Sequence, residues 1–346
     1  MHSLLLLAST LVVASAPLPR GVLPYKVHPF PGGDTIASPH YAVLVRAPPT
    51  VDANADADAD ADADPSFVWY TSVANRQPIL PGNNVPQTDR RKSTSFASFD
   101  VSGPTQVTVV LLQNASATTT AVTATTATVL PTAAGIVARI APDQRSVSLT
   151  IDAPRQVCIV INGDMDVPLC IFADPPEVGA PKGPSTKDLI YFGPGVHRIP
   201  GDAINVTENK SVYLAGGAHV YGQVRAVGVR WDGFWDGGYP CDNVKVFGRG
   251  VLDGHDIPIN YAAHAMIELP NCSNIVVEGI TTIDSPQYQI NNEAPGGRVR
   301  YAKAIAWGFT TDGWSGPCEK SPLATKNLLE VTLRGATQSI SALLMR

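Results

Sequence analysis

One small pattern recurs between Asp188 and Trp314, and its units begin with Leu189-Ile190-Tyr191-Phe192, Val212-Tyr213-Leu214, Val244-Lys245-Val246-Phe247, Ile275-Val276-Val277 and Val299-Arg300-Tyr301. The units follow one another about every 23 to 32 residues, which is a spacing typical of solenoid folds. A unit of this length cannot bury an apolar face alone, so neighbouring units must stack and share one core. Apolar residues at helical spacing are rare in this stretch. The sequence therefore predicts an all-β fold whose second domain, residues 185–346, is a right-handed parallel β-helix.

Length and composition restrict the fold class and the partners that the chain can have. The chain has 346 residues, of which 44% are hydrophobic and only 16% are charged, and Gly and Pro are abundant. These values suit a two-domain all-β protein with many turns. The net charge of −5 gives no basic surface for nucleic acid. We predict neither a metal nor an organic cofactor, and we expect a monomer.

The N-terminus carries a compartment signal. Residues Leu4 to Val13 are almost all apolar, and Ala14-Ser15-Ala16 supplies the small residues of a cleavage site. The apolar run is too short to span a bilayer, so we predict a signal peptide at 1–16, a secreted extracellular protein and no membrane partner. Glycosylation sequons, which in a secreted protein mark surface turns, occur at Asn114, Asn205, Asn209 and Asn271.

The region before the repeat is predicted to be a β-sandwich at 41–176, preceded by an extended Pro- and Gly-rich lead-in at 17–40. Short strands separated by turn residues favour this architecture. An Ala-Asp repeat at 52–64 interrupts it. Its carboxylates could bind calcium, but it lacks the Gly and Glu of a calcium loop, so a solvated insertion is favoured. The expected strands are Tyr41–Arg46, Phe67–Ala74, Phe96–Val101, Gln106–Leu112, Ala124–Leu130, Ile136–Ile140, Ser146–Ile151, Gln156–Ile161 and Leu169–Phe172.

Five cysteines in a secreted chain favour disulfides over a zinc site. Cys158 and Cys170 flank Asn162-Gly163-Asp164 between two apolar runs, so a bridge across that hairpin is expected. Among Cys241, Cys272 and Cys318, one must remain unpaired or find an outside partner.

The C-terminal part, from Ser321 to Arg346, offers one further rung at Leu328–Leu333. The final residues do not provide a polar cap, and an uncapped solenoid exposes apolar core and strand edges. We therefore expect the chain to be an incomplete or mis-spliced version of a longer protein.

Three segments resemble rungs of pectin-lyase-like β-helix glycosidases: residues 212–222, Gly248-Arg249-Gly250-Val251-Leu252-Asp253-Gly254 and residues 277–286. The phrase Trp307-Gly308-Phe309-Thr310-Thr311-Asp312-Gly313 is similar to the site motif of the dextranase and isopullulanase family, and the polygalacturonases carry a related Asn-Thr-Asp version. An N-terminal β-sandwich followed by a β-helix also fits the dextranase family better. The resemblance extends from about Phe96 to Trp314.

The resemblance implies a glycoside hydrolase that inverts the anomeric centre. Such chemistry needs an acid on the leaving oxygen and a base that holds water, with the two carboxyls about 6.5–9.5 Å apart. Rungs stacked about 4.8 Å apart can provide this separation. In the family one aspartate lies in the Thr-Asp-Gly motif and two lie on the next rung. Asp312 matches the first and nothing matches the others, because only Glu319 and Glu330 are acidic after it.

We therefore predict Asp312 as the catalytic carboxylate, with little or no hydrolysis by this chain. The substrate-binding candidates are Trp307, Trp314, Thr311 and Glu293. The expected substrate is an α-glucan of the dextran or pullulan type. A polygalacturonase-type pectinase is the alternative enzyme, since Arg298, Arg300 and Lys303 could attract an anionic chain. A carbohydrate-binding β-helix without activity is the alternative of another class. Asp253 and Asp284 are interpreted as turn residues and His255 as a structural histidine.

Overall fold

The structure is a computed structural model that describes residues 23–48, 63–72, 92–112, 122–228, 241–257, 265–292, 296–306, 313–315, 326–333 and 340–342. Within these residues the fold is all-β, as predicted, and the one helical element is the 3-10 turn η2 (Thr132–Ala134). No helix in the same residues is long and apolar enough to cross a membrane. The predicted signal peptide, most of the Ala-Asp insertion, Asn114 and Cys318 lie outside the described ranges.

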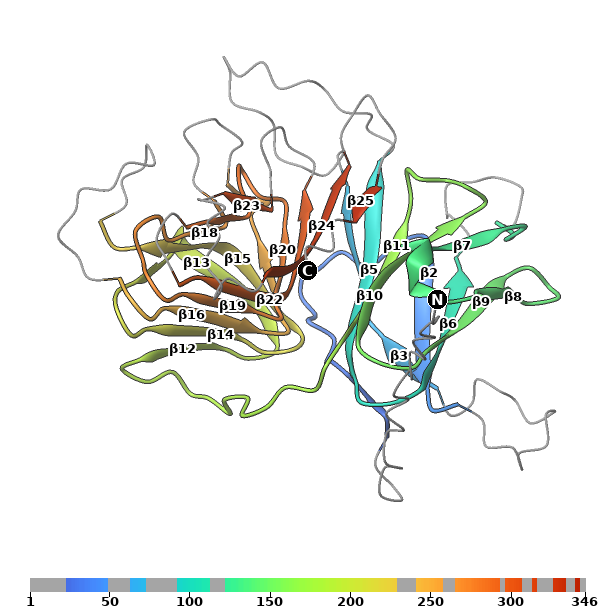
Figure 1. Ribbon diagram of the computed structural model, residues 1–346, viewed down its shortest axis with the longest axis horizontal. Coiled ribbons are helices and arrows are strands. Elements are labelled where there is room, and N and C mark those ends of the chain that lie inside the picture. Colours follow the sequence, from blue (N-terminus) through green and yellow to red (C-terminus); the bar gives the residue numbers. More distant parts are fainter. Residues whose placement is uncertain are drawn as a thin grey trace, which may run out of the picture.

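Two sheets form the N-terminal part and lie on the right of Figure 1. The six-stranded sheet contains β1 (Tyr25–Val27), β4 (Val68–Ser72), β5 (Ser93–Val101), β7 (Ala127–Leu130), β10 (Arg155–Ile161) and β11 (Leu169–Asp174). The five-stranded sheet contains β2 (Tyr41–Arg46), β3 (Asp64–Ser66), β6 (Thr105–Leu111), β8 (Arg139–Ile140) and β9 (Ser146–Ile151). Both sheets contribute buried side chains to one apolar cluster, for example Phe99 and Ile159 from the first and Val43 and Val109 from the second.

The remaining described strands form one 14-stranded sheet. They are β12 (Leu189–Phe192), β13 (Gly195–Val206), β14 (Ser211–Leu214), β15 (Ala218–Ala226), β16 (Lys245–Gly248), β17 (Val251–Asp253), β18 (Ile267–Glu268), β19 (Val276–Glu278), β20 (Thr281–Ile283), β21 (Ile290–Asn291), β22 (Arg298–Ala306), β23 (Trp314–Ser315), β24 (Lys326–Leu333) and β25 (Ile340–Ala342). All pairs are parallel except β24 with β25.

The parallel strands stack as a β-helix with three faces, seen on the left of Figure 1. The first sheet is β12-β14-β16-β19-β22, so the five predicted repeat starts pair with one another in chain order. The second sheet joins the first half of β13 to β15, β17, β20 and β22. The third joins the second half of β13 to β15, β18, β21 and β23. Strand β24 adds the further rung expected at Leu328–Leu333.

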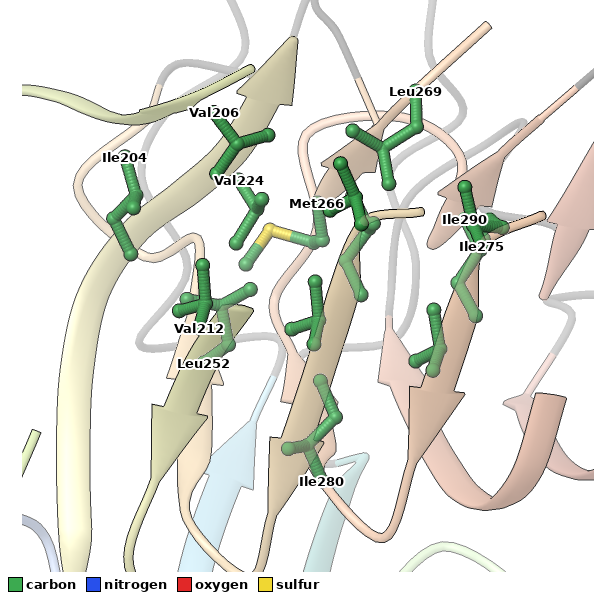
Figure 2. Close-up of a cluster of buried hydrophobic side chains, with 14 of the residues drawn as sticks. Ile204, Val206, Val212, Val224, Leu252, Met266, Leu269, Ile275, Ile280 and Ile290 are labelled. Carbon is green, nitrogen blue, oxygen red and sulfur yellow. The ribbon is translucent and has the colours of Figure 1, made fainter. Parts of the chain in front are cut away.

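Side chains from all three sheets fill the interior of the β-helix (Figure 2). Val212 comes from the first sheet, Leu252 from the second, and Val224 and Ile290 from the third, and each is at most 2% exposed. Met266 lies among them. A single rung could not bury these groups, so the stacked rungs share one core, as the repeat predicts.

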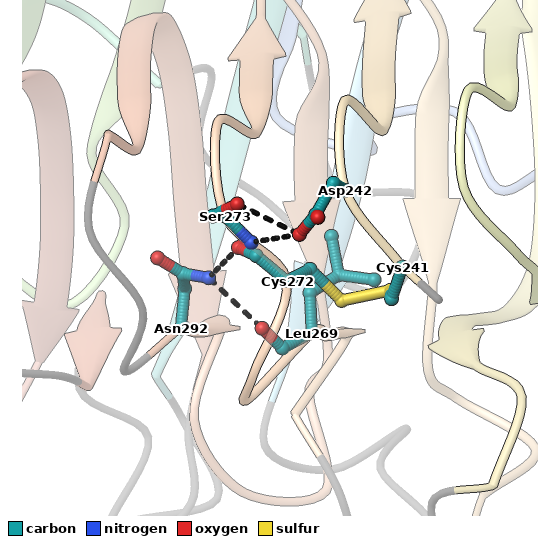
Figure 3. The surroundings of a disulfide bond; sticks show 6 residues. All are labelled: Cys241, Asp242, Leu269, Cys272, Ser273 and Asn292. Carbon is teal, nitrogen blue, oxygen red and sulfur yellow. Dashed lines mark hydrogen bonds between the residues drawn. A yellow bond between two sulfur atoms is a disulfide. The ribbon is translucent and has the colours of Figure 1, made fainter. Parts of the chain in front are cut away.

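The turns of successive rungs are tied together on the outside. Asn209, Asn243 and Asn274 each have a positive φ of 58–59°. The side-chain N–H of Asn243 donates to Oδ1 of Asn209 at 3.0 Å, and that of Asn274 donates to Oδ1 of Asn243 at 2.8 Å. Beside this ladder a disulfide joins Cys241 to Cys272, while Asn292 donates to the carbonyls of Leu269 and Cys272 (Figure 3). The predicted Cys158–Cys170 bridge is also present.

The outer face of the second sheet packs against the six-stranded sheet. Val251, Ile283 and Ile305 contact an aromatic group formed by Trp69, Phe96 and Phe172. Strands β17 and β20 are therefore buried on both faces, which explains why their sequences do not alternate between apolar and polar residues. The two parts of the chain share a continuous interface.

Candidate functional site

The motif that carries Asp312 leads directly into the third sheet. Glu293, Trp307, Thr311 and Asp312 lie outside the described residues. Trp314, two residues after Asp312, begins β23 and shares a register row with the buried Ile290 of β21. Strand β23 therefore begins directly after Gly313, the last residue of the motif.

A polar row runs along the outer face of the third sheet. In register across the rungs are Asn205, Arg225, Glu268, Asn291 and Ser315. Their strand neighbours Val224, Ile267 and Ile290 point into the core, and successive side chains alternate between faces. The side chains of Asn205, Arg225, Glu268 and Asn291 therefore lie on the outside. We call Arg225, Glu268 and Asn291 the polar row of the third sheet.

Hydrogen bonds hold the middle of this row. Glu268 is 3% exposed, and its carboxylate accepts from the amide of Asn291 at 2.6 Å and from the backbone N–H of Ala265 at 2.7 Å. Within the described part of the chain, two buried atoms of the row have no hydrogen-bond partner: Nε of Arg225, a donor, and Oδ1 of Asn291, an acceptor. Unpartnered buried polar atoms are costly, so the row contains one unused donor and one unused acceptor.

The charges of the row offset each other. Burial lowers the pKa of Arg225, and the carboxylate of Glu268 counteracts that effect. One guanidinium next to one carboxylate leaves the row close to neutral. Such a surface favours a neutral ligand over a strongly anionic one.

A cavity of about 210 Å³ lies between the N-terminal part, through the segment before β2 and strand β4 of the six-stranded sheet, and the second sheet of the β-helix. We call it the interdomain cavity. Its walls come from the segment before β2, from β4, and from β13, β15, β17 and β20 with the turns that follow the last two. It is lined by Asp34, Thr35, Ile36, Trp69, Tyr70, Thr71, Arg198, His219, Tyr221, Asp253, His255, Asp256, Ile283 and Asp284.

Asp253 and His219 form the floor of the interdomain cavity. Both side chains are at most 6% exposed, and His219 Nε2 lies 2.8 Å from Asp253 Oδ2. The other ring nitrogen, Nδ1, lies 2.8 Å from the hydroxyl of Thr35. A neutral ring that donates from Nε2 can accept from this hydroxyl at Nδ1. Burial raises the pKa of the Asp253 carboxyl, the charge of Asp284 adds to this, and the bond to His219 opposes it.

Asp284 lies one rung above Asp253 and closes the same wall. Its Oδ1 accepts from the hydroxyl of Thr71 at 2.8 Å, so an N-terminal strand holds a carboxylate of the β-helix. The turn needs glycine at Gly254, because a Cβ there would lie 2.6 Å from the carbonyl oxygen of Asp284. Asp284 itself has a φ of 53°, which an aspartate tolerates better than most residues.

The mouth of the interdomain cavity is charged and more open. The guanidinium of Arg198 bonds to Asp34 from the N-terminal segment and to Asp256 from the β-helix. It also lies over the ring of Tyr221, with Cζ 4.0 Å from the ring centre. The hydrogen bond from Arg198 lowers the pKa of Asp34. Among the described residues, no group of three or more His, Cys, Asp or Glu side chains has the arrangement of a metal site.

The sequence interpretation of Asp253 and Asp284 as turn residues and of His255 as a structural histidine does not include their position in the lining of this cavity. The available signal was their repetition, since Leu252-Asp253-Gly254 and Ile283-Asp284-Ser285 end equivalent strands of adjacent rungs. Glu268 carried no comparable signal. The charge argument for a pectic substrate was wrong for Lys303, which is 1% exposed and bonds to Asp174 at the interface.

Comparison with known proteins supports the fold. No protein family model and no curated protein sequence matches this chain. Among solved structures, it resembles Dex49A from Penicillium minioluteum, with a TM-score of 0.59 and 16% sequence identity. The match covers 84% of this chain, which spans 62% of the length of that structure. At this identity the similarity establishes a shared fold.

Proposed function

We propose that this chain is a secreted, glycoside hydrolase-like β-helix protein that binds neutral α-glucan of the dextran or pullulan type along the third sheet. The observation that carries the proposal is the polar row beside β23, where Arg225 Nε and Asn291 Oδ1 lack partners within the described residues. In this proposal, hydroxyls of the bound sugar chain supply an acceptor for Arg225 Nε and a donor for Asn291 Oδ1. The similarity to Dex49A and the dextranase-like motif at 307–313 point to the same substrate class.

In this proposal Asp312 holds the water that attacks the anomeric carbon and accepts its proton, and the product has inverted configuration. Trp307, Thr311 and Glu293 contact the sugar chain around it, whereas Trp314 is in register with the buried Ile290 and is not assigned a contact. A second carboxyl must protonate the leaving oxygen for efficient turnover. The two downstream aspartates of the resembling family have no counterpart in the given sequence, so we expect binding with slow hydrolysis.

The neutral charge of the polar row supports glucan over polygalacturonate. Arg298 and Arg300, which suggested an anionic substrate, pair with β19 on the first sheet, and Lys303 lies at the domain interface. The proposal extends to the N-terminal sheets, which we interpret as the expected β-sandwich, and to secretion, which the apolar run Leu4 to Val13 supports.

The test combines calorimetry with reducing-sugar release on dextran, pullulan and polygalacturonate. We expect the wild-type protein to bind the glucans and to release sugar slowly. Asp312→Asn should retain binding and lose release, whereas Arg225→Met should weaken glucan binding about tenfold by removing a buried donor. Asp188→Asn, an exposed position away from the row, is the matched control.

The other outcomes identify the alternatives. Preferential binding and cleavage of polygalacturonate would favour a pectinase. Glucan binding with no release by the wild-type protein would favour a binding protein. Absence of binding to all three polymers would contradict the proposal.

A further inference from the structure

The interdomain cavity is separate from the polar row of the third sheet. Its acidic residues belong to the second sheet, to the turns after β17 and β20, and to the N-terminal segment. None of the three residues of the polar row is among the described residues that line it. The proposed function therefore gives no role to the buried carboxylates of Asp253 and Asp284, to His219, or to the cross-domain bond from Thr71.

We propose that the interdomain cavity is a second binding site, which takes one neutral hexose ring whose hydroxyls donate to Asp253 and Asp284. This inference rests on the proposed function only for the choice of glucose as the probe.

The chemistry of the lining selects a ligand rich in hydroxyl donors. The cavity is lined by four carboxylates, those of Asp34, Asp253, Asp256 and Asp284, against one guanidinium, that of Arg198. A carboxylate has about four acceptor positions. Asp253 uses two of them for His219 Nε2 and the backbone N–H of His255, at 2.8 and 2.7 Å. The excess of acceptors and of negative charge disfavours an anionic sugar such as a uronate.

Burial gives these contacts strength. The carboxylates of Asp253 and Asp284 are both 6% exposed, and hydrogen bonds to charged acceptors are stronger when water is excluded. Trp69 and Tyr221 supply apolar surface beside the acids, which is the mixture that sugar sites require.

The size of the interdomain cavity limits the ligand. Its volume of about 210 Å³ is below the roughly 300 Å³ at which sites for drug-sized ligands begin, so it suits one ring and not an extended chain. The side chains at the mouth are 38–58% exposed, which leaves a route from solvent. Residues of both parts of the chain line the cavity, and Arg198 joins Asp34 to Asp256 at its mouth. A bound sugar would therefore contact both parts and stabilise their interface.

Calorimetry on the full chain with glucose, galacturonate and glucosamine tests the inference. We expect glucose to bind and galacturonate to bind at least tenfold more weakly. Asp284→Asn should weaken glucose binding tenfold or more, because one charged acceptor is lost while the hydroxyl of Thr71 keeps its partner. Asp188→Asn, on an exposed residue outside the cavity, should bind as the wild type does.

Arg198→Gln provides a second variant, which changes only the exposed mouth. It should alter the rate at which glucose dissociates and should leave the protein folded. Equal affinities for glucose in Asp284→Asn and wild type, or much tighter binding of glucosamine than of glucose, would overturn the inference. The two proposals fail separately. Dextran binding without glucose binding contradicts the cavity site alone, and glucose binding that depends on Asp284 without dextran binding contradicts the third-sheet site alone.

Discussion

His28 lies at the domain interface in surroundings that oppose its protonation. Its side chain is 8% exposed, Nε2 has no hydrogen-bond partner within the described residues, and the carboxylate of Asp100 is 3.9 Å away. Burial is the largest influence and the charge of Arg249 the next, and together they lower the pKa of His28 to about 3. Lys26 and Lys303 act in the same direction, while Asp174 opposes them.

This pKa predicts a stability loss in acid. Between pH 6.5 and about 3 the unfolded chain takes up a proton at His28 that the folded chain does not. The contribution of His28 is therefore fully present above pH 6.5 and is lost as the pH falls toward 3, by at most about 1.4 kcal/mol per pH unit. In urea unfolding across this range, His28→Asn should lose stability less steeply than the wild type. Parallel curves for the two proteins would contradict the low pKa.

Contacts between residues far apart in the chain could not be predicted from the sequence. The buried state of Lys303 depends on Asp174, and the role of Asp284 depends on Thr71; these pairs are 129 and 213 positions apart in the chain. Neither partner can be identified from local spacing, because the docking of two domains creates the pairs. The Cys158–Cys170 bridge was predictable, since a hairpin places both cysteines opposite each other.

At the scale of the elements, the turn ladder fixes the register of the rungs. Asn209, Asn243 and Asn274 take the same left-handed conformation in consecutive rungs, where asparagine is tolerated better than most residues. Each side chain hydrogen-bonds to its neighbour in the stack. The turns thereby select one alignment of the strands above and below them.

The middle residue of the ladder provides the test. Asn243→Ala removes two exposed hydrogen bonds and leaves an alanine, which tolerates the left-handed region less well than asparagine, at a φ of 58°. We expect a loss of about 1–3 kcal/mol in urea unfolding. Asn243→Gly removes the same bonds but accepts the positive φ, so it should be less destabilising than alanine. Wild-type stability in the alanine variant would show that the ladder does not stabilise the fold.

The positions of the strands were easier to predict than their pairing with distant segments. β2 and β9 have the predicted bounds, and the five repeat starts pair as one sheet, because period and β-branched runs are local properties. β1 forms within the range expected to be an extended lead-in, since it gains its hydrogen bonds from β5, more than 70 residues away. The proposed polar row likewise depends on register across rungs, which one rung's sequence does not contain.

At the scale of the whole molecule, buried charges join the two parts of the chain. Asp100 and Asp174 come from the N-terminal sheets, and Arg249 and Lys303 come from the β-helix. Arg249 Nε donates to Asp100 at 2.7 Å, and Lys303 Nζ donates to Asp174 at 2.5 Å. All four side chains are at most 5% exposed. An ion pair so deeply buried is sensitive to the loss of either partner.

We therefore expect both parts to unfold in one calorimetric transition, and Lys303→Met to uncouple them. Without the ammonium, the side-chain partners of Asp174 among the described residues are Gln156 at 3.4 Å and the guanidinium of Arg249 at 3.8 Å, so the variant should lose about 3–5 kcal/mol. Lys303→Met combined with Asp174→Asn should recover part of this loss, because the uncompensated charge is gone. Lys182→Met, in the exposed linker, is the control. A single unshifted transition in Lys303→Met would mean that apolar packing around Trp69 and Phe172 holds the interface without the ion pair.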